Sequence, residues 1–310
     1  MICLGLDTSN YTTSVAWFDG QTGENAGRLL EVRAGQLGLR QSEALFQHVV
    51  HFPEVLQRIT TAMPQDDVAA VGASYGPRPV EGSYMPCFQA GTSQGRALAL
   101  ALGVPYYGFS HQEGHLAAVL YSAGRLELME QPFLAWHLSG GTTELLYVHP
   151  GLSPEIIGGT EDLSAGQLID RTGQLLGLDF PAGKALDALG GRGEVKGFPV
   201  KVRNCRFSLS GMENQVQARC KAEAPKDEIA AFALASVCAA VKKATEQALY
   251  QYGALPVVFT GGVSSNTMLR TVMEPLDGIF GSPQYSTDNA MGIAVLTYLA
   301  ETQNLEIRNG

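Results

Sequence analysis

Two stretches of the chain repeat one short pattern: a strand, a turn of small residues, two threonines and a second strand. The first stretch covers residues 7–17 and the second covers residues 137–147. They are separated by roughly the length of one domain, as copies of one folding unit would be. The repeat predicts a duplicated fold in which each half carries one hairpin and the hairpins face each other across a cleft. Chance similarity between two hairpins is the alternative explanation for so short a match.

Around these hairpins, apolar stretches of strand length alternate with stretches of helical spacing. Such alternation is typical of the α/β class. No low-complexity linker is present, so we expect the boundary at a tight crossover near residues 109–110. This assigns residues 1–109 with 289–310 to an N-terminal lobe and residues 110–288 to a C-terminal lobe. The main strands are expected at residues 2–7, 13–18, 68–75, 106–109, 133–138, 144–149 and 257–260, and the main helices at 42–61, 88–102, 111–122, 164–176, 226–252 and 289–301.

The charge balance argues against a protein that binds nucleic acid unaided. The formal net charge is −9, whereas neutralising phosphates requires a basic surface. If RNA is a partner, we expect help from a more basic subunit.

Five scattered cysteines without a CxxC pair predict the reducing cytoplasm. Met1 leads at once into an apparent core strand, which predicts no signal peptide, and the apolar residues 230–241 are too few to span a membrane.

The sharpest local signal is the segment Ser110-His111-Gln112-Glu113-Gly114-His115. Histidines at i and i+4 lie on one face of a helix, so both imidazoles can reach one metal ion. Ser110 is expected to cap this helix. Zinc proteases with the same spacing carry a glutamate after the first histidine as general base, and Gln112 cannot take that role. Taken alone, the pattern is explained equally well by histidines at the surface or in packing.

A site with two histidines needs further ligands, such as a carboxylate or water. Asp288, in the polar turn before the last expected helix, is the best candidate by its position. A plain helix N-cap is the alternative role for an aspartate at this place. Spacing alone does not join Asp288 to the histidines.

Two glycine-rich turns indicate a site for a phosphate or a nucleotide. One reads Ser139-Gly140-Gly141-Thr142-Thr143, and the other reads Thr260-Gly261-Gly262-Val263-Ser264-Ser265-Asn266. Glycines let backbone N–H groups approach phosphate oxygens, and hydroxyls add donors. The second turn follows a strand and precedes a helix, which directs the helix N-terminus at an anion. Neither turn is a P-loop or a GxGxxG motif, and ordinary tight turns explain each of them alone.

Taken together, these motifs resemble the Gcp-like (TsaD) family, called O-sialoglycoprotein endopeptidase in older naming. Its best understood members are threonylcarbamoyl transferases that act on tRNA. The matching motifs run along nearly the whole chain, and their ordered set is highly specific. They are Leu4-Gly5-Leu6-Asp7-Thr8-Ser9, Gly76-Pro77, His111-Gln112-Glu113-Gly114-His115, Ser139-Gly140-Gly141, Ala165-Gly166, Asp170-Arg171, Leu176-Gly177-Leu178, Pro181-Ala182-Gly183, Phe207-Ser208-Leu209-Ser210-Gly211, Gly261-Gly262-Val263-Ser264-Ser265-Asn266 and Ser286-Thr287-Asp288-Asn289.

The resemblance implies a two-lobed fold of the actin, Hsp70 and sugar-kinase type, made of duplicated ribonuclease-H-like domains with a cleft between the lobes. It implies that His111, His115 and Asp288 bind one divalent metal ion, iron or zinc. The implied reaction transfers a threonylcarbamoyl group from threonylcarbamoyl-adenylate to the exocyclic amine of the adenosine next to the anticodon in tRNA. The residues implied to bind the adenylate are Leu138, Ser139, Gly140, Gly141, Thr142, Asp170, Gly183, Asp187 and Asn266.

The resemblance also implies partners, namely a related actin-like subunit and an ATPase subunit, with tRNA bound through the complex and a docking surface near the first helices.

The chain departs from the family in two turns. Asn10, Tyr11 and Thr12 stand where acidic residues are usual, and Thr142 stands where a histidine is usual. Two alternatives therefore stay open. One is a scaffold or regulatory paralogue that binds metal and nucleotide without catalysis, and the other is a small-molecule kinase or ATPase of the same fold.

Overall fold

The computed structural model describes residues 1–9, 11–32, 39–64, 67–80, 82–191, 199–285 and 289–303. The chain forms two compact units. Unit 1 comprises Met1–Leu126 with Thr287–Gly310, and unit 2 comprises Glu127–Ser286. The first boundary therefore lies after Leu126, downstream of the crossover expected near residues 109–110.

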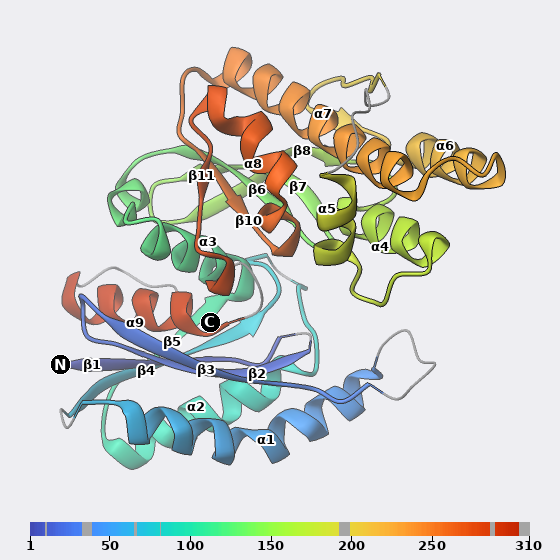
Figure 1. Ribbon diagram of the computed structural model, residues 1–310. Coiled ribbons are helices and arrows are strands. Elements are labelled where there is room, and N and C mark those ends of the chain that lie inside the picture. The colour runs from blue at the N-terminus through green and yellow to red at the C-terminus, as the bar shows by residue number, and fades with distance from the viewer. Residues whose placement is uncertain are drawn as a thin grey trace. The chain divides into compact units, whose positions relative to one another are not determined.

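Unit 1 is built on a five-stranded sheet that its described residues form. Its elements are β1 (Ile2–Asp7), β2 (Thr12–Phe18), β3 (Gly23–Leu29), α1 (Gln41–Ala62), β4 (Val68–Gly76), α2 (Phe88–Leu102), β5 (Tyr106–Ser110), α3 (His111–Ser122) and α9 (Met291–Gln303). The strand order is β3-β2-β1-β4-β5. The central strand β1 has all six residues buried, so its sequence is an apolar run that ends in one aspartate. Helices α1 and α2 cover one face of the sheet, and α9 covers the other (Figure 1).

Helix α3 belongs to unit 1 because it packs tightly against α9. The two helices cross at Gly114 and Gly292, where a Cβ atom on Gly292 would overlap the carbonyl oxygen of Gly114. A Cβ atom on Gly114 would lie 2.8 Å from Cδ1 of Ile293. Glycine at both positions lets the backbones approach this closely. This packing explains why the boundary lies after α3 rather than before it.

Unit 2 has its own sheet, with the strand order β11-β10-β6-β7-β8-β9. Its elements are β6 (Phe133–Leu138), β7 (Thr143–His149), β8 (Ser153–Thr160), α4 (Ala165–Leu176), α5 (Gly183–Gly190), β9 (Arg206–Phe207), α6 (Ser210–Lys221), α7 (Lys226–Tyr252), β10 (Val257–Thr260), α8 (Thr267–Met273) and β11 (Ile279–Phe280). The long helix α7 packs on this sheet, and Trp136 Nε1 donates a hydrogen bond to Thr245 Oγ1 at 2.9 Å. Within the described ranges, no helix has both the length and the apolar character needed to cross a membrane.

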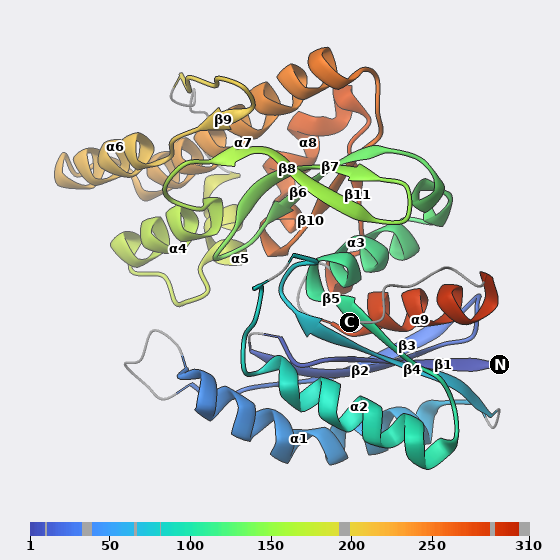
Figure 2. The ribbon, with the colours of Figure 1, turned by 180° about the vertical axis from the view of Figure 1, so that it is seen from behind.

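The two sheets share one plan. The order β3-β2-β1-β4-β5 corresponds strand for strand to β8-β7-β6-β10-β11. In each unit the repeated hairpin, β1 with β2 or β6 with β7, is antiparallel, and its first strand pairs in parallel with a strand on its other side, β4 or β10. Strand β9 is added beyond β8 at the edge of the second sheet (Figure 2). The predicted duplication is confirmed, because the two hairpins occupy the same place in their units.

The crossing of α3 and α9 predicts a sharp difference between two glycines that are each the second residue of a helix. Gly292→Ala should lower the free energy of unfolding by about 3 kcal/mol or more, because the new methyl group meets rigid backbone. Gly211→Ala on α6 is the matched control, since a Cβ atom there would meet nothing within 4 Å. The control should be neutral or stabilising by up to about 1 kcal/mol. Urea denaturation of both variants tests this, and equal stabilities would contradict it.

Candidate functional site

His111 and His115 lie at the beginning of α3, where a capping box fixes the start of the helix. Ser110 Oγ accepts a hydrogen bond from the Glu113 N–H at 3.2 Å, and Glu113 Oε2 accepts one from the Ser110 N–H at 2.6 Å. The predicted cap at Ser110 is confirmed. Because this cap makes His111 the first helical residue, His115 follows one turn later on the same face.

The two imidazoles are buried side by side. His111 is 9% exposed and His115 is 5% exposed. Their ring centroids are 4.2 Å apart, with the ring planes at 74°. The spacing in the sequence thus places two imidazoles at one point of unit 1.

Asp7, at the end of β1, is fully buried beside His111. Its Oδ2 lies 3.1 Å from His111 Nδ1 and accepts a hydrogen bond from Ser9 Oγ at 2.6 Å, while the Ser74 hydroxyl donates to Oδ1. Burial by itself would raise the pKa of Asp7. The charge of His111 and the hydrogen bonds from His111, Ser74 and Ser9 outweigh burial and hold the pKa below its ordinary value. Asp7 is therefore an ionised carboxylate that orients the His111 ring.

Asp7 is a residue of this site that the sequence motifs did not reveal as such. The signal that could have found it is a single carboxylate at the end of the apolar run Ile2–Asp7, because a buried charge requires a partner. We call Asp7, His111 and His115 the histidine cluster.

The two imidazoles of the histidine cluster are of a kind that suits a metal ion. The Asp7 contact is made through His111 Nδ1, which directs the other ring nitrogen toward a ligand, as in carboxylate–histidine–metal arrangements. Asp288, the third ligand that we expect, lies outside the described residues. Among the residues that are described, no three or more His, Cys, Asp and Glu side chains gather closely enough to hold a metal. The complete ligand set therefore stays a prediction.

The first glycine turn links β6 to β7 and lies against the start of α4. The Ser139 N–H donates to the Thr142 carbonyl oxygen at 2.8 Å, and the Thr142 N–H donates to Ser139 Oγ at 3.1 Å. Ser164, the N-cap of α4, donates its hydroxyl to the Gly140 carbonyl oxygen at 2.8 Å. These bonds hold the turn in one conformation and anchor it to α4.

The second glycine turn follows β10 and lies beside the end of β6. Gly261 has a φ of 86°, and a Cβ atom there would overlap the carbonyl oxygen of Leu138. Only glycine fits such a position. The chain continues through Gly262–Ser265 to Asn266, whose side chain caps α8 by accepting from the Leu269 N–H at 2.9 Å. The two predicted glycine turns therefore meet at one end of β6.

The two predicted acidic residues of unit 2 have different surroundings. Asp187 Oδ1 accepts from Asn266 Nδ2 at 2.7 Å and from Thr267 Oγ1 at 2.9 Å, and its Oδ2 accepts from the Thr267 N–H at 3.0 Å. Asp187 thus joins α5 to the start of α8. Asp170 on α4 accepts one bond through Oδ1, from the Ala182 N–H at 2.9 Å. Burial raises the pKa of Asp170, and the bond from Ala182 only partly opposes that effect.

Several glycines of this region border open space. A Cβ atom on Gly140, Gly141, Gly183 or Gly262 would meet no atom within 4 Å. Their backbone can therefore be approached closely, as N–H groups that bind phosphate must be. We define the glycine-turn cluster as the nine residues predicted to bind the adenylate, which stay a prediction: Leu138, Ser139, Gly140, Gly141, Thr142, Asp170, Gly183, Asp187 and Asn266.

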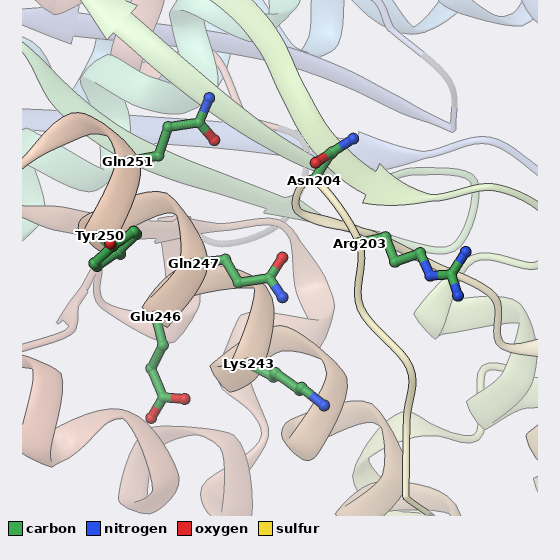
Figure 3. A pocket seen from close by; sticks show the side chains of 7 residues that line it. All are labelled: Arg203, Asn204, Lys243, Glu246, Gln247, Tyr250 and Gln251. Carbon is green, nitrogen blue, oxygen red and sulfur yellow. The ribbon is translucent and has the colours of Figure 1, made fainter.

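A hollow in unit 2 lies elsewhere. It is lined by Arg203, Asn204 and side chains from the second half of α7 (Figure 3). Helix α5 of the glycine-turn cluster packs on the first half of α7, where Gly190 meets Leu234. The stretch of α7 from Leu234 to Gln247 is about 20 Å long at ~1.5 Å per residue. The hollow is thus a separate feature.

Comparison with known proteins gives one consistent family. The family model described as "TsaD: tRNA N6-adenosine threonylcarbamoyltransferase" matches residues 35–295. The curated protein of Chlorobium phaeobacteroides with the name tRNA N6-adenosine threonylcarbamoyltransferase is 30% identical, over 100% of this chain and 94% of its own length.

Solved structures confirm the fold class. Component A of (R)-2-hydroxyglutaryl-CoA dehydratase from Acidaminococcus fermentans matches with a TM-score of 0.60 and 17% identity, over 97% of this chain and 99% of that chain. Full-length HypF, solved in a phosphate- and nucleotide-bound form, matches with a TM-score of 0.64 and 14% identity, over 98% of this chain and 56% of that chain. These proteins have the actin, Hsp70 and sugar-kinase type of fold, as expected for this chain from its sequence. At such identities the likeness concerns the fold alone.

The bonds of Asp187 predict a structural cost when its carboxylate is removed. Asp187→Ala should lower the free energy of unfolding by about 1–3 kcal/mol, because it leaves the donors of Asn266 and Thr267 without their acceptor. Asp179→Ala is the matched control, since Asp179 is an exposed carboxylate on the preceding loop. Thermal and urea denaturation of the two variants measure the difference. A stability of Asp187→Ala equal to that of the control would refute the assignment.

Proposed function

Because the chain belongs to the TsaD family of tRNA N6-adenosine threonylcarbamoyltransferases, we propose that it transfers a threonylcarbamoyl group from threonylcarbamoyl-adenylate to tRNA. The acceptor is the exocyclic amine of the adenosine next to the anticodon. The amine nitrogen forms a bond to the carbamoyl carbon, the bond from that carbon to the phosphate oxygen breaks, AMP leaves, and the amine proton passes to solvent. The observation that carries this proposal is the meeting of two glycine turns with open backbone at the end of β6.

In this proposal the glycine-turn cluster binds the adenylate. Backbone N–H groups at Gly140, Gly141 and Gly262 hold the phosphate, since their surroundings leave room for it. Asp170 accepts a ribose hydroxyl through Oδ2, because the Ala182 bond occupies Oδ1. Asp187 directs its carboxylate at Asn266 and α8 and therefore positions the second turn rather than contacting the ligand itself.

The histidine cluster is proposed to hold one divalent metal ion, iron or zinc, through His111, His115 and Asp288. When bound, such an ion supplies Lewis acidity and a template for substrate oxygens. Asp7 keeps the His111 ring in one orientation through its bond to Nδ1. Ser9 and Ser74 in turn fix the Asp7 carboxylate.

Partners are proposed to dock on α1. Phe46, Val49 and Val50 on this helix are 67%, 47% and 56% exposed. Their spacing places them on neighbouring parts of one helix surface, and exposed apolar clusters of this kind mark interaction sites. A related actin-like subunit is the partner that we propose for this surface, with an ATPase subunit and tRNA joining the complex. The net charge of −9 supports a requirement for such help in binding tRNA.

The metal proposal predicts that His115→Ala loses most of its bound iron or zinc. Asp7→Asn should keep the metal but bind it about 10–100-fold more weakly, because it removes the carboxylate that orients a ligand. His149→Ala is the control, since His149 is an exposed histidine of unit 2. Elemental analysis after incubation with iron or zinc, followed by metal titration, gives the result. Folded wild-type protein that takes up neither metal would remove the basis of this proposal.

The altered turns predict a direct test of the reaction. Wild-type protein should transfer labelled threonylcarbamoyl from its adenylate to unmodified tRNA when the partner subunits are present. The variant Tyr11→Asp, Thr12→Glu, Thr142→His carries the residues usual for the family at these positions. If the altered turns are compatible with catalysis, both proteins should react at similar rates.

The opposite outcome identifies a scaffold. No transfer by wild type in any combination of partners, together with transfer by the triple variant, would show that the altered turns ended catalysis. Thermal shifts with an adenylate analogue provide an independent reading, because a ligand stabilises a protein that binds it by mass action. A scaffold that has kept its nucleotide site would show the shift without the transfer.

A further inference from the structure

The hollow on the second half of α7 has a volume of about 800 Å³ and is lined by residues whose side chains carry charged or polar groups. Glu246 is the single acid among its seven lining residues, which are Arg203, Asn204, Lys243, Glu246, Gln247, Tyr250 and Gln251. In Figure 3 the side chains of Lys243 and Gln247 extend from α7 toward the segment that carries Arg203 and Asn204. No step of the proposed reaction uses these residues.

The wall opposite α7 is a short basic hairpin. Arg203 and Arg206 exchange two backbone hydrogen bonds of 2.9 Å, so they are cross-strand partners whose side chains leave the hairpin on one face. Before the turn, exposed Lys201 and Arg203 alternate with buried Val200 and Val202. Successive side chains of an extended segment point to opposite sides, so the two valines pack against the protein while Lys201 and Arg203 face solvent.

The hairpin is held firmly against α7. Gln247 Oε1 accepts from the Cys205 N–H at 3.1 Å, and Gln247 Nε2 donates to the Val202 carbonyl oxygen at 3.0 Å. Lys243 Nζ donates to the Val200 carbonyl oxygen at 3.2 Å. Three bonds from one helix thus hold the backbone of the hairpin, so this segment need not be ordered when its cations bind an anion.

An exposed aromatic ring completes the hollow. Tyr250 is 94% exposed and lies one helical turn beyond Glu246 and two turns beyond Lys243, on the same side of α7. A tyrosine so open to solvent contributes little to the core, and it offers a flat face on which a nucleobase can stack.

These observations combine exposed cations on a firmly held hairpin with a stacking surface, on a chain whose net charge is −9. We infer that this hollow and the adjoining hairpin form an RNA contact surface, at which Lys201, Arg203 and Arg206 of the hairpin bind backbone phosphates and Tyr250 stacks on an unpaired base. The inference rests on the proposed function in one respect, namely that the RNA is the tRNA substrate. The hollow lies about 20 Å along α7 from the part that packs on the glycine-turn cluster, so it would contact the tRNA away from the reacting adenosine.

The test is binding of a fluorescent, unmodified tRNA transcript by the purified full-length chain, measured by anisotropy at low ionic strength and then with added salt. Low ionic strength strengthens phosphate contacts, so the weak binding expected of this acidic chain without its partners becomes measurable. Arg203→Ala with Arg206→Ala should weaken binding and reduce the slope of log affinity against log salt by ~1 for each phosphate that the variant no longer neutralises. Tyr250→Ala should weaken binding by about tenfold with little change in slope, and Tyr250→Trp should retain it.

The control is Arg58→Ala with Lys221→Ala, which removes two exposed cations outside the hollow and gives the same net charge as the double arginine variant. It should bind nearly as wild type. The inference is overturned if both double variants lose the same affinity and slope, if wild type binds no RNA at low ionic strength, or if polyglutamate competes as well as RNA does. The last result would indicate an acidic protein segment as the ligand.

Binding and transfer are measured separately, so the two proposals can fail separately. Loss of RNA affinity in the hollow variants, with no transfer by wild type in any partner combination, would support the contact surface and reject the transferase. Transfer by wild type, with unchanged RNA affinity and salt slope in the hollow variants, would reject only the contact surface.

Discussion

The close crossing of α3 and α9 at Gly114 and Gly292 is the contact on which unit 1 depends. It holds α3 on the face of the sheet that α9 covers, with both histidines near the end of β1. Asp7 then reaches His111 across the packed interior, and the two serines that bind Asp7 come from the turn after β1 and from β4. A pair of glycines therefore determines which side chains can form the histidine cluster.

Much of this fold could be predicted because it is encoded locally. The helices α2, α3 and α7 begin and end at the residues expected from their periodicity, and the repeated hairpins revealed the duplication. Strands β3 and β8 were not expected, because their exposed and glycine-containing sequences do not form apolar runs. Helix α6 was not expected either, because only Met212 and Val216 are buried in it.

The site was predictable where spacing along the chain decides it and unpredictable where tertiary contacts do. His111 and His115 are neighbours because of helical geometry alone. The role of Asp7 depends on contacts with residues far along the chain, so the local sequence signals only a buried carboxylate that needs a partner and does not identify His111 as that partner. For Asp187, the sequence suggested a ligand contact, and it gave no sign of the hydrogen bonds that its carboxylate accepts from Asn266 and Thr267, about 80 residues further along the chain. The third metal ligand that we expect lies outside the described residues.

The strand order common to the two units shows where a duplicated protein can change most readily. Strand β9 pairs with the outer edge of β8, and the shared order of the other strands is intact. An outermost strand that finds a neighbour within its own chain is also less open to pairing with another molecule. A strand added at the edge of a sheet changes the surface of one copy. The core that both copies inherit stays under the same packing constraints.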